Sequence, residues 1–231
     1  MTPSIRLFSF YRSSCGWRAR TALYWKEVPF EPVYVNTFKG DHRLPFYAEI
    51  SPTRTVPTMV VDDSWRITQS SAILEYLEEA IPRRHLLYRD PMLRAQVRSI
   101  VSIIVSDIQP LQSPRTLWRF KDVALEDPES VRRAAKEVVG ERFKGLERAL
   151  ESTHGRYSVG DKVTMADVCL VPMVFNAHLY GVDMTPFPLS TSISERLLEE
   201  HEPFRKAHPR NQPDNEDEYP DVGWWQKPKV A

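Results

Sequence analysis

The chain has 231 residues, of which 42% are hydrophobic and 11% aromatic, and its 31 Lys and Arg side chains balance its 31 Asp and Glu side chains. The length allows one large domain or two small ones with a real core, and the balanced charge gives no attraction to nucleic acid or to an anionic membrane. No basic segment leads into a long apolar one near the start, and no run of about 18 apolar residues exists, so neither a signal peptide nor a membrane-spanning helix is expected.

The first 85 residues alternate strand and helix patterns. Strands are expected over 5–10, 30–35, 58–61 and 65–67, the last two as a hairpin, with one helix following residues 13–18 and another from residue 69. Ser70 is the expected N-cap of the second helix, which Pro82 ends. Residues 36–52 are polar and read as irregular. The order βαβ and then ββα predicts an α/β domain, a small mixed four-stranded sheet with helices on it.

From Pro91 onward the apolar period is 3.6, which predicts an all-α domain. One apolar stripe covers 93–108, a second follows Pro128, and Thr164 with Asp167 has the form of a capping box. A last amphipathic helix is expected over 192–201. The resulting domains are 1–84, a linker at 85–92, a helical domain at 93–211, and an acidic tail at 212–231, whose Trp224–Trp225 pair either packs on a domain or contacts a partner.

The two cysteines differ in their surroundings. Cys169 lies in the apolar run 168–171 and is expected to pack inertly in the core. Cys15 lies where a strand ends and a helix begins. Their separation offers neither a zinc spacing nor a disulfide framework, so no metal site is expected and the chain is expected to be cytoplasmic.

The most informative segment is 13–20, which reads SSCGWRAR. It places two hydroxyls, a thiol and unpaired backbone N–H groups at a helix start, where partial positive charge favours an anion. A sulfur anion is the candidate ligand. A serine in this place could also serve only as the helix N-cap, and Arg18 could be a surface residue of the helix.

The mixed unit with Val56–Pro57 before its third strand resembles the thioredoxin-like fold, in which this proline is usually cis. With the helical domain after it, the chain resembles a cytosolic glutathione transferase. Segment 13–20 resembles the signature of the zeta class, the maleylacetoacetate isomerases. Further segments that fit this class are 107–112, 157–161, 165–172 and 208–214.

The resemblance implies a set of site residues. Glutathione contacts fall on Ser13, Ser14, Cys15, Gly16, Trp17, Arg18, His42, Val56, Gln69, Ser70, Gln109, Ser113, Pro114 and Arg115. Ser13 is the expected hydroxyl donor to the glutathione sulfur, with Ser14 as a second hydroxyl or a cap and Cys15 tuning the site. Arg18 is the expected cation for the substrate carboxylate and the developing enolate, with Arg12 and Arg115 as further candidates.

The resemblance also implies a reaction. The thiolate of glutathione adds to the cis double bond of maleylacetoacetate, the bond rotates while single, and elimination gives fumarylacetoacetate and regenerates glutathione, a step of phenylalanine and tyrosine catabolism. Transferase activity toward small electrophiles such as α-haloacids and a homodimer are implied as well. One departure concerns the substrate: relatives usually carry Arg where this chain has Leu179, and neighbouring His178 replaces it only if the helix presents it inward.

Two other functions remain open. A cysteine at a helix start is nucleophilic, so Cys15 could serve a glutathione-dependent thiol reductase through a mixed disulfide. A serine facing the sulfur and the lack of a C-x-x-C partner argue against it. The chain could also be a non-catalytic transferase-like module that acts through its tail, although Ser13, Gln69 and Ser70 are all present.

Overall fold

The computed structural model describes residues 3–113, 116 and 128–216. By their contacts these residues form two compact units: the first ends at His85 and resumes at His201, and the second runs from Leu86 to Glu200. The helical domain predicted at 93–211 therefore differs from the structure at its C-terminal end. Residues from His201 onward belong to the first unit because helix α10 (Glu202–Ala207) packs against helix α1 (Ser14–Trp25).

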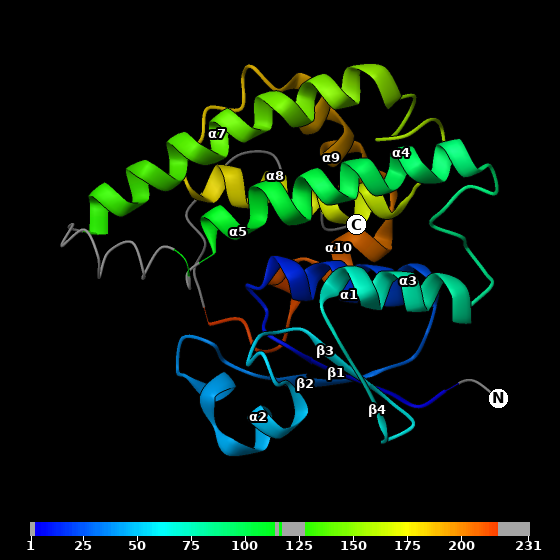
Figure 1. The fold of residues 1–231 in the computed structure, drawn as a ribbon, viewed down its shortest axis with the longest axis vertical. Helices are drawn as coiled ribbons and strands as arrows, with labels where there is room; N and C mark the ends of the chain where they lie inside the picture. Colours follow the sequence, from blue (N-terminus) through cyan, green and yellow to red (C-terminus); the bar gives the residue numbers. More distant parts are fainter. Residues whose placement is uncertain (1–2, 114–115, 117–127, 217–231) are drawn as a thin grey trace. The chain divides into compact units, whose positions relative to one another are not determined.

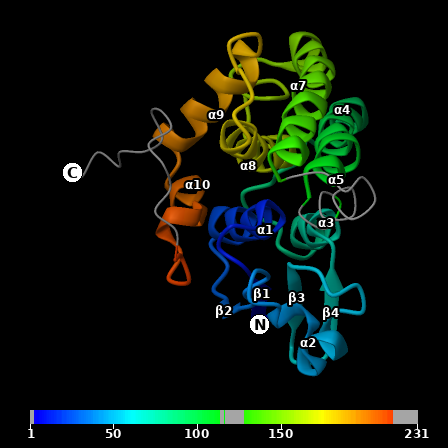
Figure 2. The same ribbon diagram turned by 90° about the vertical axis from the view of Figure 1, so that its left-hand side faces the viewer.

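A four-stranded mixed sheet lies at the centre of the first unit. Its strands are β1 (Ile5–Ser9), β2 (Glu31–Tyr34), β3 (Thr58–Val61) and β4 (Trp65–Thr68). They lie in the order β2-β1-β3-β4, with β1 and β2 parallel and the other pairs antiparallel. Helices α1 and α3 (Ser70–Ala80) cover one face, and α2 (Pro45–Ile50) covers the other (Figures 1 and 2). The predicted βαβ–ββα arrangement is confirmed, and the Val56–Pro57 peptide is cis.

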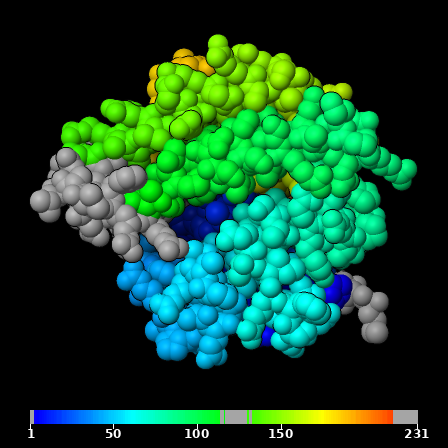
Figure 3. All heavy atoms as spheres, in the orientation of Figure 1, coloured from blue at the N-terminus to red at the C-terminus, as the bar shows by residue number. Residues whose placement is uncertain are grey.

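The central strands are covered on both faces. All four residues of β3 are buried, whereas most of β2 and β4 at the sheet edges is exposed or half-buried. In the space-filling view, the light-blue and cyan atoms of α2, the β3–β4 hairpin and α3 leave little of the dark-blue β1 and α1 in sight (Figure 3). A strand buried on both sides must be apolar throughout, as Thr58–Val61 nearly is.

Residues 36–52 are not irregular throughout, as the sequence suggested. They contain a 3-10 turn, η1 (Asp41–Arg43), and helix α2 with Pro45 at its first position. Tyr47 is the one fully buried residue of α2, where it packs with Phe8, Val35 and Val60. A six-residue helix with a single buried side chain has no apolar period, so no pattern in the sequence could reveal it.

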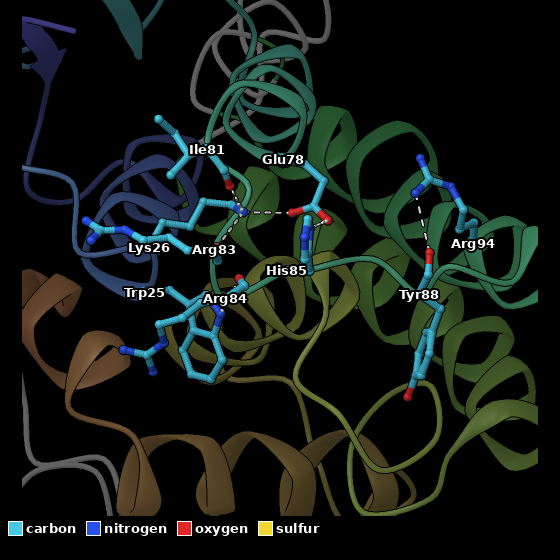
Figure 4. A network of polar contacts seen from close by, with 9 residues as sticks. All are labelled: Trp25, Lys26, Glu78, Ile81, Arg83, Arg84, His85, Tyr88 and Arg94. Atoms are coloured by element: carbon cyan, nitrogen blue, oxygen red, sulfur yellow. Dashed lines mark hydrogen bonds and ion pairs between the residues drawn. The ribbon is translucent and has the colours of Figure 1, made fainter. Parts of the chain in front are cut away.

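An ion pair inside the first unit holds the chain that follows α3 (Figure 4). The Lys26 ammonium has no exposed surface and lies 2.8 Å from a Glu78 carboxylate oxygen. It also donates to the carbonyl oxygens of Ile81 (3.1 Å) and Arg83 (3.2 Å). The other Glu78 oxygen lies 3.0 Å from Nδ1 of His85. The end of α1 is thereby joined to the end of α3 and to the segment that leaves it.

The described part of the second unit is helical. Its elements are α4 (Pro91–Ser102), the π-helical stretch η2 (Ile103–Ile108), α5 (Gln109–Gln112), α7 (Pro128–Thr153), α8 (Met165–Leu179) and α9 (Pro188–Glu200). The single stripe predicted at 93–108 is thus divided between α4 and η2, although Ile104 and Ile108 remain buried. Among the helices that the structure describes, none has the length and apolar character needed to cross a membrane.

The predicted capping box at the start of α8 is confirmed. The fully buried Asp167 carboxylate accepts hydrogen bonds from the Thr164 N–H (2.7 Å) and hydroxyl (2.9 Å) and from the Ser158 N–H (2.9 Å). Cys169, two residues further along α8, has no exposed surface. Its predicted place in the core is confirmed as well.

Candidate active site

The loop between β1 and α1 carries the serine pair that the sequence singled out. Ser13 is the N-cap of α1, with extended backbone (φ −68°, ψ 113°), and its Oγ accepts the Gly16 N–H at 3.0 Å. Capping uses an acceptor lone pair and leaves the hydroxyl proton available. Ser13 can therefore cap the helix and donate to an anion at the same time, so the two roles considered for it are compatible.

Arg18 is a buried residue and not a surface residue of the helix. Its side chain has no exposed surface, and one of its terminal nitrogens lies 3.8 Å from the Cys15 sulfur and 3.4 Å from the Ser70 hydroxyl oxygen. The guanidinium thus lies behind the starts of both α1 and α3. In this position it provides positive charge from inside the protein, which opposes the loss of solvation of any anion held there.

Packing around the start of α1 explains why position 16 is a glycine and position 17 a tryptophan. A Cβ on Gly16 would lie 2.6 Å from the Ser9 hydroxyl oxygen and 3.3 Å from a terminal nitrogen of Arg20. Trp17 is 1% exposed, and its ring meets the His208 ring edge-on at 4.8 Å. Their N–H groups both donate to Ser13, that of Gly16 to the hydroxyl oxygen (3.0 Å) and that of Trp17 to the carbonyl oxygen (2.8 Å). Both residues therefore serve the packing and the first turn of α1.

The start of α3 has an uncommon backbone. Gln69, and not Ser70 as expected, is the N-cap residue, with φ 69° and ψ 120° and no side-chain capping bond. Such a conformation costs a non-glycine residue on the order of 1–3 kcal/mol and is typical of ligand sites. Ser70 is the first helical residue and is 4% exposed. The exposed Gln69 side chain therefore does not cap α3.

Two other expected contacts lie elsewhere in the first unit. His42 is in η1, and its buried Nδ1 has no hydrogen-bond partner among the described residues. Burial lowers the pKa of His42 from its ordinary value, as does the neighbouring Arg43, so at neutral pH this ring is a neutral hydrogen-bonding group. Val56 follows Thr55, whose carbonyl accepts hydrogen bonds from the Tyr47 hydroxyl (2.7 Å) and the Ser51 hydroxyl (3.1 Å). The backbone before β3 is fixed by these bonds.

The remaining expected residues are in the second unit. Gln109 begins α5, and the Ser113 hydroxyl donates to the Pro110 carbonyl at 3.2 Å and shares a 2.8 Å hydrogen bond with the Thr116 hydroxyl. Ser113 thus fixes its own turn. Pro114 and Arg115, together with Trp224 and Trp225, lie outside the described residues.

The position at which the family resemblance leads us to expect Arg lies near the end of α8. Leu179 ends this helix, and the preceding His178 is half-buried. Burial lowers the pKa of His178, so at neutral pH this ring is a hydrogen-bonding group without positive charge. His178 therefore lacks the permanent positive charge that an arginine would bring to this place.

Two residues that contact the serine loop were not singled out from the sequence. Arg20 donates to the Tyr11 carbonyl, and Asp214 accepts the Tyr11 N–H. Each lies inside a motif that the sequence did supply, 13–20 and 208–214. The signal was present, but nothing local indicated that the two motifs meet at the backbone of one residue, Tyr11.

The donors of the first unit fit an anionic, peptide-like ligand. The hydroxyls of Ser13 and Ser70, the first turns of α1 and α3, and the buried Arg18 all favour negative charge. The buried Nδ1 of His42 is a polar atom in need of a partner. This set suits carboxylates and a thiolate, which are the anionic groups of glutathione.

Family models match most of the chain. Residues 12–80 match the N-terminal domain of glutathione S-transferase, and residues 116–202 match its C-terminal domain. The maleylacetoacetate isomerase of Mus musculus is 44% identical over 210 residues, 90% of this chain and 94% of that protein. The probable maleylacetoacetate isomerase 2 of Drosophila melanogaster is 42% identical over 216 residues, 93% of this chain and 92% of that protein.

Solved structures agree with the sequence comparison. A maleylacetoacetate isomerase from Anaeromyxobacter dehalogenans, solved with glutathione in its active site, has a TM-score of 0.84 and 33% identity and covers 93% of this chain and 99% of that one. A bacterial maleyl pyruvate isomerase described as a zeta-class glutathione S-transferase has a TM-score of 0.83 and 33% identity, covering 91% and 99%. The chain therefore belongs to the glutathione S-transferase family, in the zeta class that contains the maleylacetoacetate isomerases.

Proposed function

We propose that this enzyme converts maleylacetoacetate to fumarylacetoacetate with glutathione as a regenerated cofactor, and that it also joins glutathione to small electrophiles such as α-haloacids. The observation that carries the proposal is the start of α1. There, the Ser13 hydroxyl caps the helix and still has a proton to donate, and the buried Arg18 lies beneath. Family membership over at least 90% of the chain supports the same activity.

The chain's own groups can account for an ionised sulfur. When bound, glutathione supplies a thiolate that adds reversibly to a conjugated double bond, which can rotate while it is single. A free thiol has a pKa of about 8.5, and lowering it by about two units takes about 2.7 kcal/mol. A hydroxyl that donates to a charged sulfur supplies about 1.5–3 kcal/mol, and a helix N-terminus adds about 0.3–1 kcal/mol. Together, the Ser13 hydroxyl and the N-terminus of α1 supply the free energy that this lowering of the thiol pKa requires.

The other donors hold the ends of the tripeptide in this proposal. Gln69 and the start of α3 face the γ-glutamyl carboxylate, His42 donates to the glycyl carboxylate, and the backbone of Val56 pairs with the peptide. Arg18 acts through Cys15 and Ser70 and not by direct contact with substrate, because its side chain has no exposed surface. Contacts from Gln109, Ser113, Pro114 and Arg115 remain predictions from the family resemblance.

The test is the cis-to-trans isomerisation of maleylacetone, followed with and without glutathione. We expect turnover that depends strictly on glutathione and a product free of sulfur. Activity that persists after glutathione is removed would contradict the proposal. Glutathione binding that fails at millimolar concentration would instead support a non-catalytic module.

Cys15 distinguishes the isomerase from a thiol reductase. Cys15 is half-buried at the start of α1, and its sulfur lies 3.8 Å from a terminal nitrogen of Arg18. In the isomerase, Cys15→Ala keeps most of the turnover because the sulfur that reacts belongs to glutathione. If Cys15→Ala abolished isomerisation, and if a mixed disulfide of Cys15 with glutathione formed during turnover, the reductase assignment would replace ours.

We further propose that the enzyme is a cytoplasmic homodimer, as the family resemblance implies. The native protein should have twice the mass of the chain in light scattering at micromolar concentration. Fractionation of cells that produce it should recover the activity with the cytosol.

A further inference from the structure

Arg20 is a buried cation whose guanidinium holds the loop before its own helix. It is 3% exposed and donates to the Ser9 hydroxyl (2.8 Å), the Phe10 carbonyl (3.2 Å) and the Tyr11 carbonyl (2.9 Å). Two of its nitrogens also donate to the Ala207 carbonyl at 3.2 and 3.3 Å. Helical side chains lean toward the N-terminus, so Arg20 reaches this loop from the second turn of α1.

A short path leads from Arg20 to the candidate catalytic hydroxyl. The Phe10 carbonyl that accepts from Arg20 also accepts the Ser13 N–H at 3.0 Å. Arg20 thus fixes the oxygen that fixes the backbone of Ser13. The fork of the guanidinium spans the carbonyls of two successive residues, which a single ammonium cannot reproduce.

Asp214 holds the same loop through the other backbone group of Tyr11. Its carboxylate accepts the Tyr11 N–H at 2.9 Å across 203 residues of sequence, while Arg20 binds the Tyr11 carbonyl. Tyr11 is 2% exposed, so neither of its backbone groups can turn to water for a partner. Burial raises the pKa of Asp214, and the hydrogen bond from Tyr11 opposes this.

We propose that Arg20 and Asp214 are positioning residues that clamp the Tyr11 backbone between α1 and the C-terminal segment and thereby set the place of the Ser13 hydroxyl. This inference rests on the proposed function, since it concerns the same sulfur-binding site. It gives the segment 208–214 a role in that site, although this segment does not contact the reacting atoms. Positioning of this kind matters because a displacement of about 1 Å can cost about a hundredfold in rate.

The test compares matched variants of the full chain. Asp214→Leu removes the acceptor at similar size, whereas Asp214→Asn keeps an oxygen for the Tyr11 N–H. Arg20→Lys keeps the charge and loses the fork. Glu216→Gln is the control, because it breaks the exposed 2.7 Å pair with Lys39 in the same C-terminal segment. Circular dichroism shows which variants are folded, and Asp214→Leu, which leaves Arg20 in place, carries the test if Arg20→Lys does not fold.

The first readout needs no glutathione. Amide hydrogen exchange of Tyr11 and Ser13, measured by NMR on the ligand-free protein, should be at least about tenfold faster in Asp214→Leu and Arg20→Lys, because local opening is easier without the clamp. It should be unchanged in Glu216→Gln and close to wild type in Asp214→Asn. Unchanged exchange in both clamp variants would overturn the proposal.

The second readout is the pH profile of isomerisation. In Asp214→Leu we expect kcat to fall about ten- to a hundredfold and the apparent pKa of the bound thiol to rise, with Asp214→Asn restoring both. Equal loss in Asp214→Leu and Asp214→Asn would overturn the clamp. If the wild-type protein does not isomerise maleylacetone at all, the proposed function fails instead, and the exchange measurement still decides the positioning.

Discussion

At the scale of single residues, the hydroxyl of Ser13 has two tasks that can be separated. As N-cap it stabilises α1 through the Gly16 N–H, and as donor it would stabilise a bound thiolate. Loss of the first affects folding, and loss of the second affects the ionisation of sulfur. A comparison with another N-cap distinguishes them.

We expect Ser13→Ala to lower turnover by about ten- to a hundredfold and to raise the apparent pKa of bound glutathione, because one charge-assisted hydrogen bond of about 1.5–3 kcal/mol is lost. The thiolate is followed by its ultraviolet absorbance in a pH titration. The control is Asp90→Ala, since Asp90 caps α4 through the Leu93 N–H at 2.9 Å. Both variants should lose about 0.5–2 kcal/mol of stability, and only Ser13→Ala should change the pKa. Wild-type turnover in Ser13→Ala would refute its role.

At the scale of elements, the first unit joins its helices through buried polar groups. Lys26 at the end of α1 binds Glu78 of α3 and two carbonyls beyond it, as Figure 4 shows. The desolvation of two such charges is costly, so the pair gives little net stability over apolar residues, whereas one partner alone is strongly unfavourable. The pair therefore matters more for how α1 and α3 are joined than for total stability.

Lys26→Met should lower the free energy of unfolding by about 3–5 kcal/mol, because Glu78 and two carbonyls lose a buried cation. The double variant Lys26→Met/Glu78→Leu should recover most of that loss. Urea denaturation followed by circular dichroism measures both. Lys144→Met serves as the control, since its 2.6 Å pair with Glu141 is exposed and should contribute less than about 1 kcal/mol. A double variant no more stable than Lys26→Met would contradict this account.

At the scale of the whole molecule, the pH range of stability depends on buried histidine. Burial lowers the pKa of His208 to about 3, with help from the charges of Arg210 and Arg20. Its Nδ1 accepts the Arg210 N–H at 3.1 Å, which requires the neutral ring. The unfolded chain binds a proton near pH 6.5, and the folded chain does not until about pH 3. Stability from this residue is therefore present above pH 6.5 and is lost as the pH falls toward 3.

The free energy of unfolding should fall by up to about 1.4 kcal/mol per pH unit in this window on account of His208. In His208→Gln this contribution is absent, so the variant should lose less stability than wild type between pH 6.5 and pH 4. Chemical denaturation at a series of pH values measures the two slopes. They should coincide above pH 7.5, where neither state of His208 titrates. Equal slopes below pH 6 would show that His208 is not held neutral.

What the sequence determined by itself was local or repeated along the chain. Apolar periods placed most helices and strands, turn residues and Thr164 with Asp167 marked their ends, and segment 13–20 marked the candidate anion site. These signals act over a few residues, so they survive without tertiary context. Helix α2 gave no such signal, because only Tyr47 in it is fully buried.

Tertiary structure alone decided how distant segments share the site. Three features of the site depend on neighbours far away in sequence. They are the backbone conformation of Gln69, the burial of Arg18 against Ser70, and the hydrogen bond from Tyr11 to Asp214. A buried arginine and an exposed one look alike in sequence, since burial is a property of the packed chain. For the same reason the C-terminal segment from His201 joins the first unit, although its local pattern is only that of another helix.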